Sequence, residues 1–228
     1  MMPLFLAISK NRQNYLKIVY SLAEDFSPDL EEDPELLKEN ATLIGPIPAK
    51  KLRAYSSESV FCLDEERSKT LQDTVIHYAW ERLLRYLSLR ERSIGECRSY
   101  LQRLQLSEES INDLINKAIK KRYIDEERFA ELLTRSYVNR RKSRTELRNA
   151  LIAKRIPADI IEKIIDLYYT REDRDEILRY HIAKGIRKYP VKKSRKDYEK
   201  CISYLMRKGF NYADFRDELL LYYVDTGE

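Results

Sequence analysis

The residues most suited to chemistry in this sequence are clustered cations. Arg140, Arg141 and Lys142 are consecutive, and Arg144 and Arg148 follow within two helical turns. Successive residues point to different sides of a helix, so one row of acids cannot neutralise all of them, and they suit an extended polyanion. A similar cluster lies about 50 residues later: Lys192, Lys193, Arg195 and Lys196. We interpret both clusters as binding surfaces, and the alternative is a solvated helix face.

Further cations and aromatic residues extend this pattern. Arg90, Arg92 and Arg98 form a weaker cluster in the first half of the chain, and Arg207 and Lys208 follow the later one. Four tyrosines near these clusters could stack on nucleic-acid bases, but their helical spacing favours packing inside or at the edge of a core. They are Tyr137, Tyr168, Tyr189 and Tyr204.

The residues of familiar catalytic and cofactor sites do not occur in the required patterns. The 5 glycines are too dispersed for a G-x-G-x-x-G motif or a P-loop, and no serine lies in G-x-S-x-G. His77 and His181 are far apart and lack metal-ligand spacing, so we interpret each as a partly buried helix residue. Most carboxylates stand where capping or solvation explains them. We therefore expect a binding protein with no catalytic residue, no cofactor and no metal.

The net charge of +5 is unevenly distributed along the 228 residues. Residues 1–63 carry 7 Lys/Arg and 9 Asp/Glu, whereas residues 64–228 carry 36 and 29. The basic character thus belongs to the C-terminal part, which is expected to bind a polyanion or an acidic protein surface.

Apolar residues from about Asp64 onward recur at spacings of three and four, which predicts amphipathic helices. The 5 glycines and 7 prolines provide few hairpin turns, which favours a mainly all-α fold. Three serines are each followed by an acid three residues later, a pattern that begins helices because the hydroxyl accepts from a backbone N–H. The pairs are Ser93 with Glu96, Ser143 with Glu146, and Ser194 with Asp197.

These capping serines indicate an internal repeat, since Ser143 follows Ser93 by 50 residues and Ser194 follows Ser143 by 51. A shift of 50 also places apolar residues on apolar residues over three successive helices. The aligned pairs include Ala79 with Phe129, Leu83 with Leu133, Leu101 with Leu151, Leu106 with Ile156, Ile111 with Ile161 and Leu114 with Ile164. A third copy requires an insertion of a few residues in its middle helix.

Each repeat is therefore predicted to contain three helices, the middle one capped by serine. Asp125 and Pro157 begin helices in the second repeat, and in the third Gly209 ends one helix while Asn211 begins the next. Three tandem three-helix repeats are expected to form an elongated, curved rod, and the alternative is a compact helical bundle. The predicted segments are an N-terminal extension over 1–63 and repeats over 64–124, 125–171 and 172–228.

Residues 1–63 do not share the repeat pattern. The apolar residues of Asn14–Leu22 could form a strand, Phe26–Glu39 is acidic, and the glycine and prolines of Ile44–Pro48 exclude a helix. A small strand-containing lobe and a partly disordered arm are both open, and we favour the lobe. Because the apolar periodicity begins after this segment, we expect the repeats to fold without it.

The compartment follows from the cysteines and the first residues. Cys62, Cys97 and Cys201 are far apart, and an odd number cannot form a closed disulfide framework, which favours a reducing compartment. The apolar run before Lys10 is short and lacks a preceding basic region, so it predicts neither a signal peptide nor a membrane span. We expect a cytoplasmic protein without a membrane partner.

Two segments carry a more specific pattern. Residues 123–130 (YIDEERFA) are followed by the basic turn Arg140–Ser143 and by Leu151–Ile156, and residues 205–212 read LMRKGFNY. This pattern resembles the RecX family of regulatory proteins, over about Thr74 to Tyr223. The first repeat departs from it at residues 93–97 (SIGEC), and residues 1–63 match nothing that we identify.

The resemblance implies a regulator of the RecA recombinase in DNA repair, DNA recombination and the SOS response. Such a protein binds the RecA filament and single- and double-stranded DNA, inhibits the recombinase ATPase and strand exchange, and limits filament growth. It implies a DNA-binding monomer and no catalytic residue. By position, the implied contact residues are Arg140, Arg141, Lys142, Arg144, Lys192, Lys193, Arg195, Arg207 and Lys208.

Other functions are compatible with the same residues. A sequence-independent DNA-binding protein with no filament partner would use helix pairs joined at basic corners. A helical scaffold for acidic protein partners is a second alternative, and an enzyme is a third.

Overall fold

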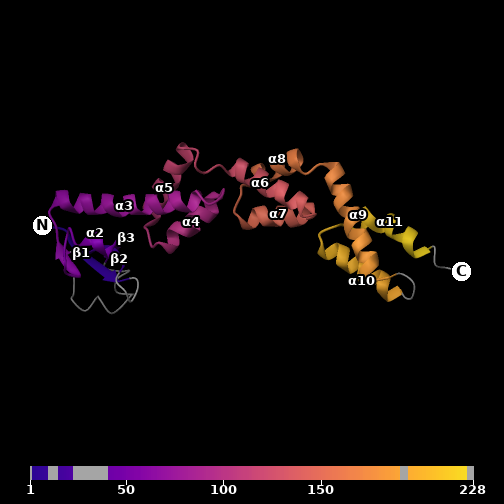
Figure 1. Ribbon diagram of the computed structural model, residues 1–228, viewed down its shortest axis with the longest axis horizontal. Helices are drawn as coiled ribbons and strands as arrows, with labels where there is room; N and C mark the ends of the chain where they lie inside the picture. Colours follow the sequence, from indigo (N-terminus) through magenta and orange to yellow (C-terminus); the bar gives the residue numbers. More distant parts are fainter. Residues whose placement is uncertain (1, 10–14, 23–40, 191–194, 225–228) are drawn as a thin grey trace. The chain divides into compact units, whose positions relative to one another are not determined.

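The computed structural model describes residues 2–9, 15–22, 41–190 and 195–224. The chain divides into two compact units, Met1–Ile124 and Asp125–Glu228, which Figure 1 colours from indigo to yellow. The division falls at the end of the predicted first repeat. No helix in the described residues is long and apolar enough to cross a membrane. The elongated, curved rod stays a prediction.

The first unit begins with a four-stranded antiparallel sheet whose strand order is β3-β2-β1-β4. Alternate side chains point to opposite faces. On one face Phe5 and Ala7 join the main core, and on the other Leu6 lies in a small separate cluster. The predicted strand-containing lobe is thus confirmed, whereas Phe26–Glu39 lies outside the described residues. The strands are β1 (Leu4–Ser9), β2 (Leu16–Leu22), β3 (Ala41–Pro48) and β4 (Val60–Cys62).

Four helices lie in the described residues of the first unit, and the longest of them packs against the sheet. Gly45 in β3 has a φ of +141°, and a Cβ there would lie 2.9 Å from Val75 Cγ1 and 2.6 Å from Leu106 Cδ2. Glycine is required at this position because the strand, the long helix at Val75 and the turn at Leu106 approach so closely. The helices are α2 (Ala49–Leu52), α3 (Glu65–Leu87), α4 (Ile94–Arg103) and α5 (Glu108–Lys120).

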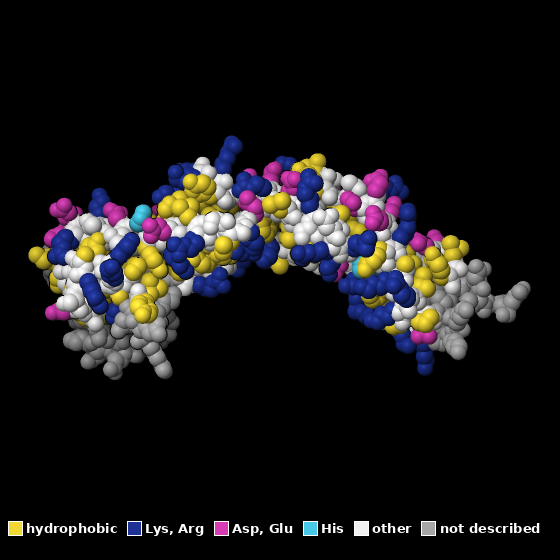
Figure 2. Space-filling view, in the orientation of Figure 1, with side chains coloured by type: hydrophobic (Ala, Val, Ile, Leu, Met, Phe, Trp, Pro, Cys, Tyr) yellow, Lys and Arg dark blue, Asp and Glu magenta, His cyan; other side chains and the backbone are white. Residues whose placement is uncertain are grey.

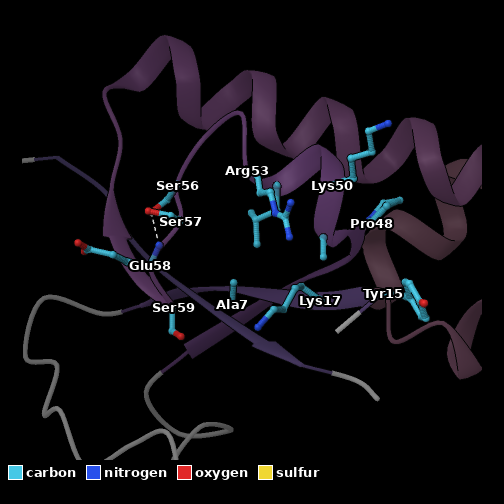
Figure 3. Close-up of a pocket in the computed structure, with 12 residues that line it drawn as sticks. Ala7, Tyr15, Lys17, Pro48, Lys50, Arg53, Ser56, Ser57, Glu58 and Ser59 are labelled. Atoms are coloured by element: carbon cyan, nitrogen blue, oxygen red, sulfur yellow. Dashed lines mark hydrogen bonds between the residues drawn. The ribbon is translucent and has the colours of Figure 1, made fainter. Parts of the chain in front are cut away.

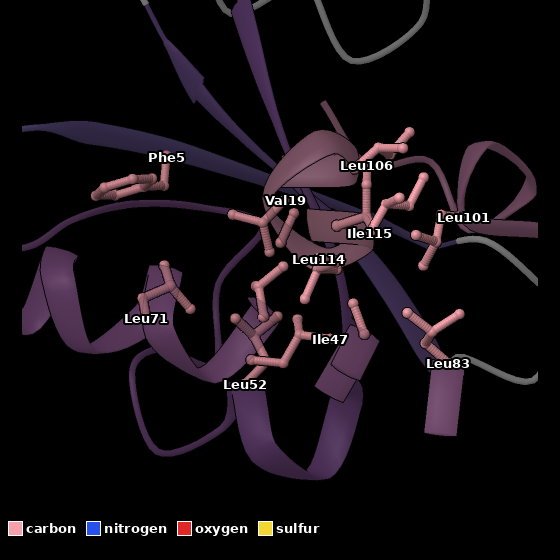
Figure 4. Packing of buried hydrophobic residues seen from close by; sticks show 14 of the residues in the cluster. Phe5, Val19, Ile47, Leu52, Leu71, Leu83, Leu101, Leu106, Leu114 and Ile115 are labelled. Carbon is pink, nitrogen blue, oxygen red and sulfur yellow. The ribbon is translucent and has the colours of Figure 1, made fainter. Parts of the chain in front are cut away.

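The sheet and the first three-helix repeat share a single core. Val19 and Ile47 from the sheet lie in the same buried cluster as Leu71, Leu101 and Leu114 from the helices (Figure 4). The shared core argues against the expectation that the first repeat folds without residues 1–63, which stays a prediction. A chain beginning at Asp64 would expose the face of α3 that the sheet covers, at a cost proportional to the apolar area returned to water.

The second unit contains two sets of three helices within its described residues. Phe129, Leu151 and Ile165 from the first set lie in one buried cluster with Leu205 and Phe215 from the second. The second and third repeats therefore share a core. The helices are α6 (Glu126–Asn139), α7 (Arg144–Ala153), α8 (Ala158–Tyr168), α9 (Arg171–Lys188), α10 (Arg195–Arg207) and α11 (Tyr212–Val224).

The predicted repeat pattern is confirmed by burial and by capping. Leu101 and Leu151 are both fully buried. Ser93 and Ser143 are buried as well, and each hydroxyl accepts from the backbone N–H three residues later at 3.1 Å. The predicted insertion in the third repeat agrees with the lengths of α10, 13 residues, and α7, 10 residues. Ser194, the predicted cap of α10, lies outside the described residues.

A left-handed turn joins the second and third helices of every repeat. Gln105, Arg155 and Gly209 have φ values of 62°, 59° and 86° in these turns. Such a residue ends a helix by turning its last backbone groups back on the helix. Only the third turn has glycine, and there a Cβ would lie 2.6 Å from Thr145 Cβ of α7. The third repeat thus requires glycine because its turn packs against the second repeat.

The two histidines differ from each other. His181 is buried, 5% exposed, as the sequence predicts. The same prediction is wrong for His77, whose side chain is 62% exposed and lies 3.3 Å from Glu81. His77 lies on the solvent side of α3 between positions that face the core, and the apolar periodicity alone already placed it off the buried stripe.

Candidate nucleic-acid interface

The basic turn of the second repeat lies between α6 and α7. Arg140 is the C-cap of α6, and Arg141 adopts a left-handed φ of 53°. Lys142 N–H then donates to the carbonyl of Tyr137 at 2.9 Å, which closes the end of α6. Arg140 and Arg141 are exposed in this turn and Lys142 is half-buried.

A buried histidine fixes this turn to the third repeat. His181 Nε2 donates to the carbonyl of Arg141 at 2.8 Å, and His181 Nδ1 lies 3.0 Å from the hydroxyl of Tyr204. Burial lowers the pKa of His181, and the nearby charges of Lys208 and Lys184 lower it further. The ring is therefore neutral at neutral pH and joins α6, α9 and α10 without adding a charge.

Cations from two repeats meet beside this histidine. The guanidinium carbon of Arg141 lies 4.5 Å from the ring centre of Tyr180, and Lys184 Nζ lies 5.8 Å from the same centre. Both distances allow a cation–π interaction. Arg140, Arg141 and Lys184 have no acidic partner among the described residues, so their charge is available to a ligand.

One carboxylate organises the remaining cations. Glu146 accepts from Lys142 Nζ at 3.1 Å and lies 3.6 Å from Lys208 Nζ, and it also accepts from the backbone N–H of Ser143. Burial opposes ionisation of this carboxyl, but these hydrogen bonds and the charge of Lys208 outweigh it and lower the pKa of Glu146. We define the corner surface as the six residues Arg140, Arg141, Lys142, Tyr180, Lys184 and Lys208. Figure 2 shows dark blue side chains gathered over α9 and α10 in this part of the second unit.

The other predicted residues of α7 lie in a different environment. Arg144 forms an ion pair with Asp166, and Arg148 forms two hydrogen bonds with the carboxylate of Glu162. Both acids belong to α8, so these arginines link two helices and part of their charge is neutralised. Arg144 and Arg148 stay predicted contact residues, but the structure does not bring them into the corner surface.

The predicted residues of α10 form a second, smaller group. Lys196 and Arg207 line a shallow hollow of about 340 Å³ together with Tyr189 and Lys200. Arg195 is almost fully exposed and lies 3.4 Å from Glu199. Lys192 and Lys193 lie outside the described residues.

The weaker cluster of the first repeat is largely paired. Arg90 donates to both carboxylate oxygens of Glu96, and Arg98 lies 2.8 Å from Glu108. Arg92 lies 4.0 Å over the ring of Tyr86, which stacks in turn on Tyr100 with its ring centre 4.2 Å away. These cations mainly stabilise the repeat.

Sequence reasoning missed three residues here: Tyr180 and Lys184 of the corner surface, and His181, which fixes the turn beside it. Tyr180 and Lys184 stand four residues apart on α9 and share one face of that helix, which is a signal visible in the sequence. The link from His181 to the turn at Arg141 spans 40 residues and had no local signal. The tyrosines predicted to pack do so: Tyr137, Tyr168 and Tyr189 lie against the core and Tyr204 is buried within it.

Two family models match this chain. The model described as RecX, first three-helix domain, matches residues 79–117, and the one described as RecX, second three-helix domain, matches residues 125–164. The chain thus carries two three-helix domains of the RecX family, and the relatives that match it are named regulatory proteins. The two matched segments are the first two predicted repeats, and the corner surface takes three of its residues from the second.

Curated relatives agree with this assignment. The regulatory protein RecX of Oceanobacillus iheyensis is 28% identical over 166 residues, which cover 72% of this chain and 60% of the relative. That of Staphylococcus epidermidis is 26% identical over 57% of this chain and 48% of the relative. The aligned part thus spans about half to three fifths of the length of these relatives.

Solved structures show the same fold. A crystal structure of regulatory protein RecX covers 95% of this chain and 98% of its own with a TM-score of 0.61, and at 19% identity it supports the fold alone. The crystal structure of RecX from Lactobacillus salivarius is 28% identical, covers 64% of this chain and 97% of its own, and has a TM-score of 0.57.

Proposed function

We propose that this protein binds the RecA recombinase filament and DNA, and that it inhibits the recombinase ATPase and strand exchange and limits filament growth. The match to the RecX family supports the recombinase as partner. The corner surface supports contact with a polyanion, because it places unpaired cations beside a half-buried aromatic ring.

The observation that carries the proposal is the convergence of cations from two repeats on one place. Arg140 and Arg141 come from the end of α6, Lys184 comes from α9, and Lys208 comes from the end of α10. A solvated helix face would present cations from one helix, alternating with acids. Cations that leave three helices toward one region suit the phosphates of a nucleic-acid backbone or of a filament groove.

The test is a titration of the full chain into RecA-dependent ATPase and strand-exchange reactions, together with direct measurement of DNA binding at several salt concentrations. We expect inhibition at protein concentrations well below those that coat the DNA. Inhibition only when the DNA is fully coated would instead favour the alternative, a sequence-independent DNA-binding protein. Binding to neither DNA nor filament would favour a scaffold for other acidic proteins.

The decisive variant carries Arg140→Glu, Arg141→Glu and Lys184→Glu, which reverses the unpaired cations and leaves the pair of Lys142 with Glu146 intact. Exposed charges contribute little to folding, so the thermal melting curve should be nearly unaltered. Binding and inhibition should be lost together, and the slope of log affinity against log salt should fall by roughly one for each lost phosphate contact.

The first unit provides a matched control. Lys120, Lys121 and Arg122 are also three consecutive exposed cations at the end of a helix, and Arg122 also has a left-handed φ, of 56°. Their change to Glu alters the net charge by the same amount. If this control weakens binding as much as the corner variant, the effect is one of net charge and the corner surface has no special role.

A further inference from the structure

The N-terminal lobe holds an open cavity of about 680 Å³. Its walls come from β1, β2, α2 and the segment that precedes β4, as Figure 3 shows. The cavity belongs to the first unit and shares no residue with the corner surface. Its function is therefore a separate question from that of the corner surface.

Lys17 occupies an unusual position in this cavity. It lies on β2, which is a central strand, and it points to the same face as Val19, because side chains two residues apart share a face. That face otherwise supplies Phe5, Ala7 and Ile47 to the core. Lys17 is half-buried and has no acidic partner among the described residues, so its charge is available to a ligand in the cavity.

Arg53 faces Lys17 across the cavity. It is the C-cap of α2, and its guanidinium points from α2 toward the sheet (Figure 3). Lys50, on the same helix, also lines the cavity, although its side chain points away from the sheet in the same view. Arg53 likewise has no acidic partner in the described part of the chain.

Hydroxyl groups complete the polar wall. Ser56 and Ser57 line the cavity beside Glu58, its single acid. The backbone N–H of Glu58 donates to Ser56 Oγ at 3.0 Å, so this hydroxyl remains able to donate its own proton. The lining residues thus present three cations, Lys17, Lys50 and Arg53, and hydroxyl donors against one acid.

This combination fits a phosphate group better than a carboxylate. A phosphate monoester carries about −1.5 to −2 charge at neutral pH and three acceptor oxygens, which match two cations and additional hydroxyl donors. Since Glu58 offsets one of the three cations, a carboxylate, with its single charge, would still leave one cation unbalanced.

The cavity is also larger than a phosphate requires, since its volume lies in the range of about 300–1,000 Å³ typical of sites for small organic ligands. Beyond Lys17 it is lined by Pro48 and by Tyr15, whose ring is 71% exposed. An exposed aromatic ring beside an apolar wall suits a flat base. The remaining wall is formed by the buried residues Ala7 and Leu52.

We propose that this cavity binds a nucleoside phosphate, with the phosphate between Lys17 and Arg53 and the base against Tyr15. The same chemistry is offered by a free nucleotide and by the 5′-phosphorylated end of a nucleic-acid strand. The proposal does not rest on the proposed function, because it concerns different residues in the other unit.

The experiment is isothermal titration calorimetry of the full chain with ATP, with a 5′-phosphorylated trinucleotide, with the same trinucleotide carrying a 5′-hydroxyl, and with inorganic phosphate. Binding of ATP or of the phosphorylated trinucleotide supports the proposal and identifies the source. Equal binding of the two trinucleotides would overturn the role of the phosphate. Inorganic phosphate that binds as tightly as ATP would overturn the role of the base, and no binding of any probe at millimolar concentration would overturn the whole proposal.

Variants test the assigned residues. Lys17→Met and Arg53→Gln should each weaken binding about tenfold or more, because each removes a charge-assisted hydrogen bond. Lys51→Gln is the matched control, since it removes the same charge from the same helix at an exposed residue that does not line the cavity, and its binding should change less than about twofold. Equal losses of affinity in all three variants would show that only the net charge matters, and would overturn the site.

The same series of variants includes controls for misfolding and for binding at the corner surface. Arg53 is exposed, so Arg53→Gln should keep the wild-type circular dichroism spectrum even if Lys17→Met alters the lobe. The corner variant with Arg140, Arg141 and Lys184 changed to Glu should bind nucleotide as the wild type does. Loss of nucleotide binding in the corner variant would overturn the separate site, whereas loss of recombinase inhibition alone concerns only the proposed function.

Discussion

The α3–α4 and α6–α7 junctions occupy equivalent places in two repeats, yet their acids have opposite roles. Both junctions begin the middle helix with a buried serine, and both carry a glutamate three residues later. In the first, Glu96 neutralises Arg90 from the same junction. In the second, Glu146 attracts Lys142 from its own junction and Lys208 from the next repeat.

The aromatic partners differ in the same way. Arg92 covers Tyr86, which is itself stacked on Tyr100, so the cation and both rings are used within the repeat. Arg141 contacts Tyr180, a residue of the following repeat, and leaves its guanidinium exposed. The same capping sequence therefore supports a self-contained structural junction in one repeat and a candidate binding junction in the other. What decides between them is whether a further repeat follows within the same core.

The largest difference between the two units should appear on truncation. A chain of residues 125–228 retains the whole cluster shared by the second and third repeats, whereas a chain of residues 64–228 loses the sheet part of the first unit's core. We expect cooperative thermal unfolding of the shorter chain. In the longer chain, the backbone amides of α3 to α5 should show little protection from hydrogen exchange. Full protection of α3 in that chain would show that the sheet is dispensable.

The next largest effect concerns equivalent core leucines. Leu101→Ala and Leu151→Ala should each destabilise their unit by about 2–5 kcal/mol, since both side chains are fully buried. Chemical denaturation measured by circular dichroism tests this. The exposed neighbour Ile152, at 56% exposure, provides a control whose change to Ala should cost far less. Similar losses at all three positions would mean that the helix faces are not as described.

A smaller loss of stability is expected when either capping hydroxyl is removed. Ser93→Ala and Ser143→Ala should each cost about 1 kcal/mol, the usual loss when a hydroxyl cap is removed. Ser143 belongs to a complete capping box with Glu146, so its cost should be at least that of Ser93. Thr in place of Ser at both positions serves as the control, because it keeps the hydroxyl.

The smallest expected effect distinguishes the two glutamates by DNA binding. Glu146→Gln removes the anion that holds Lys142 and Lys208, so affinity for DNA should rise a few-fold and depend more steeply on salt. Glu96→Gln, the matched change in the first repeat, should leave binding unaltered. Fluorescence anisotropy with a labelled duplex measures both. Lower affinity of Glu146→Gln would show instead that Glu146 positions the lysines for binding.

Much of the fold could be predicted because it depends on local patterns. The serine caps, the left-handed end of the middle helix at Gly209 and the matching core positions are all set by residues close in sequence. Contacts between residues far apart in the sequence could not be predicted in this way. Val19 lies in a segment predicted as a possible strand and Ile47 in one predicted not to be helical, but only the sheet register brings the two together onto α3.

The candidate site was predictable to a similar degree. The basic turn at Arg140, Arg141 and Lys142 was visible as a run of cations. The acids that pair with Arg144 and Arg148 could not be predicted, because both lie on α8, across the helix pair. The link from His181 to Arg141 likewise depends on how the third repeat packs on the second.

The shared core of the first unit has a consequence for synthesis on the ribosome. The strands are made first, but the cluster that buries them also needs residues as late as Ile124. At roughly 5–20 residues per second, translation from residue 63 to residue 124 takes several seconds, during which the apolar face of the sheet lacks its helices. The nascent N-terminal lobe is therefore a stage at which we expect chaperone contact.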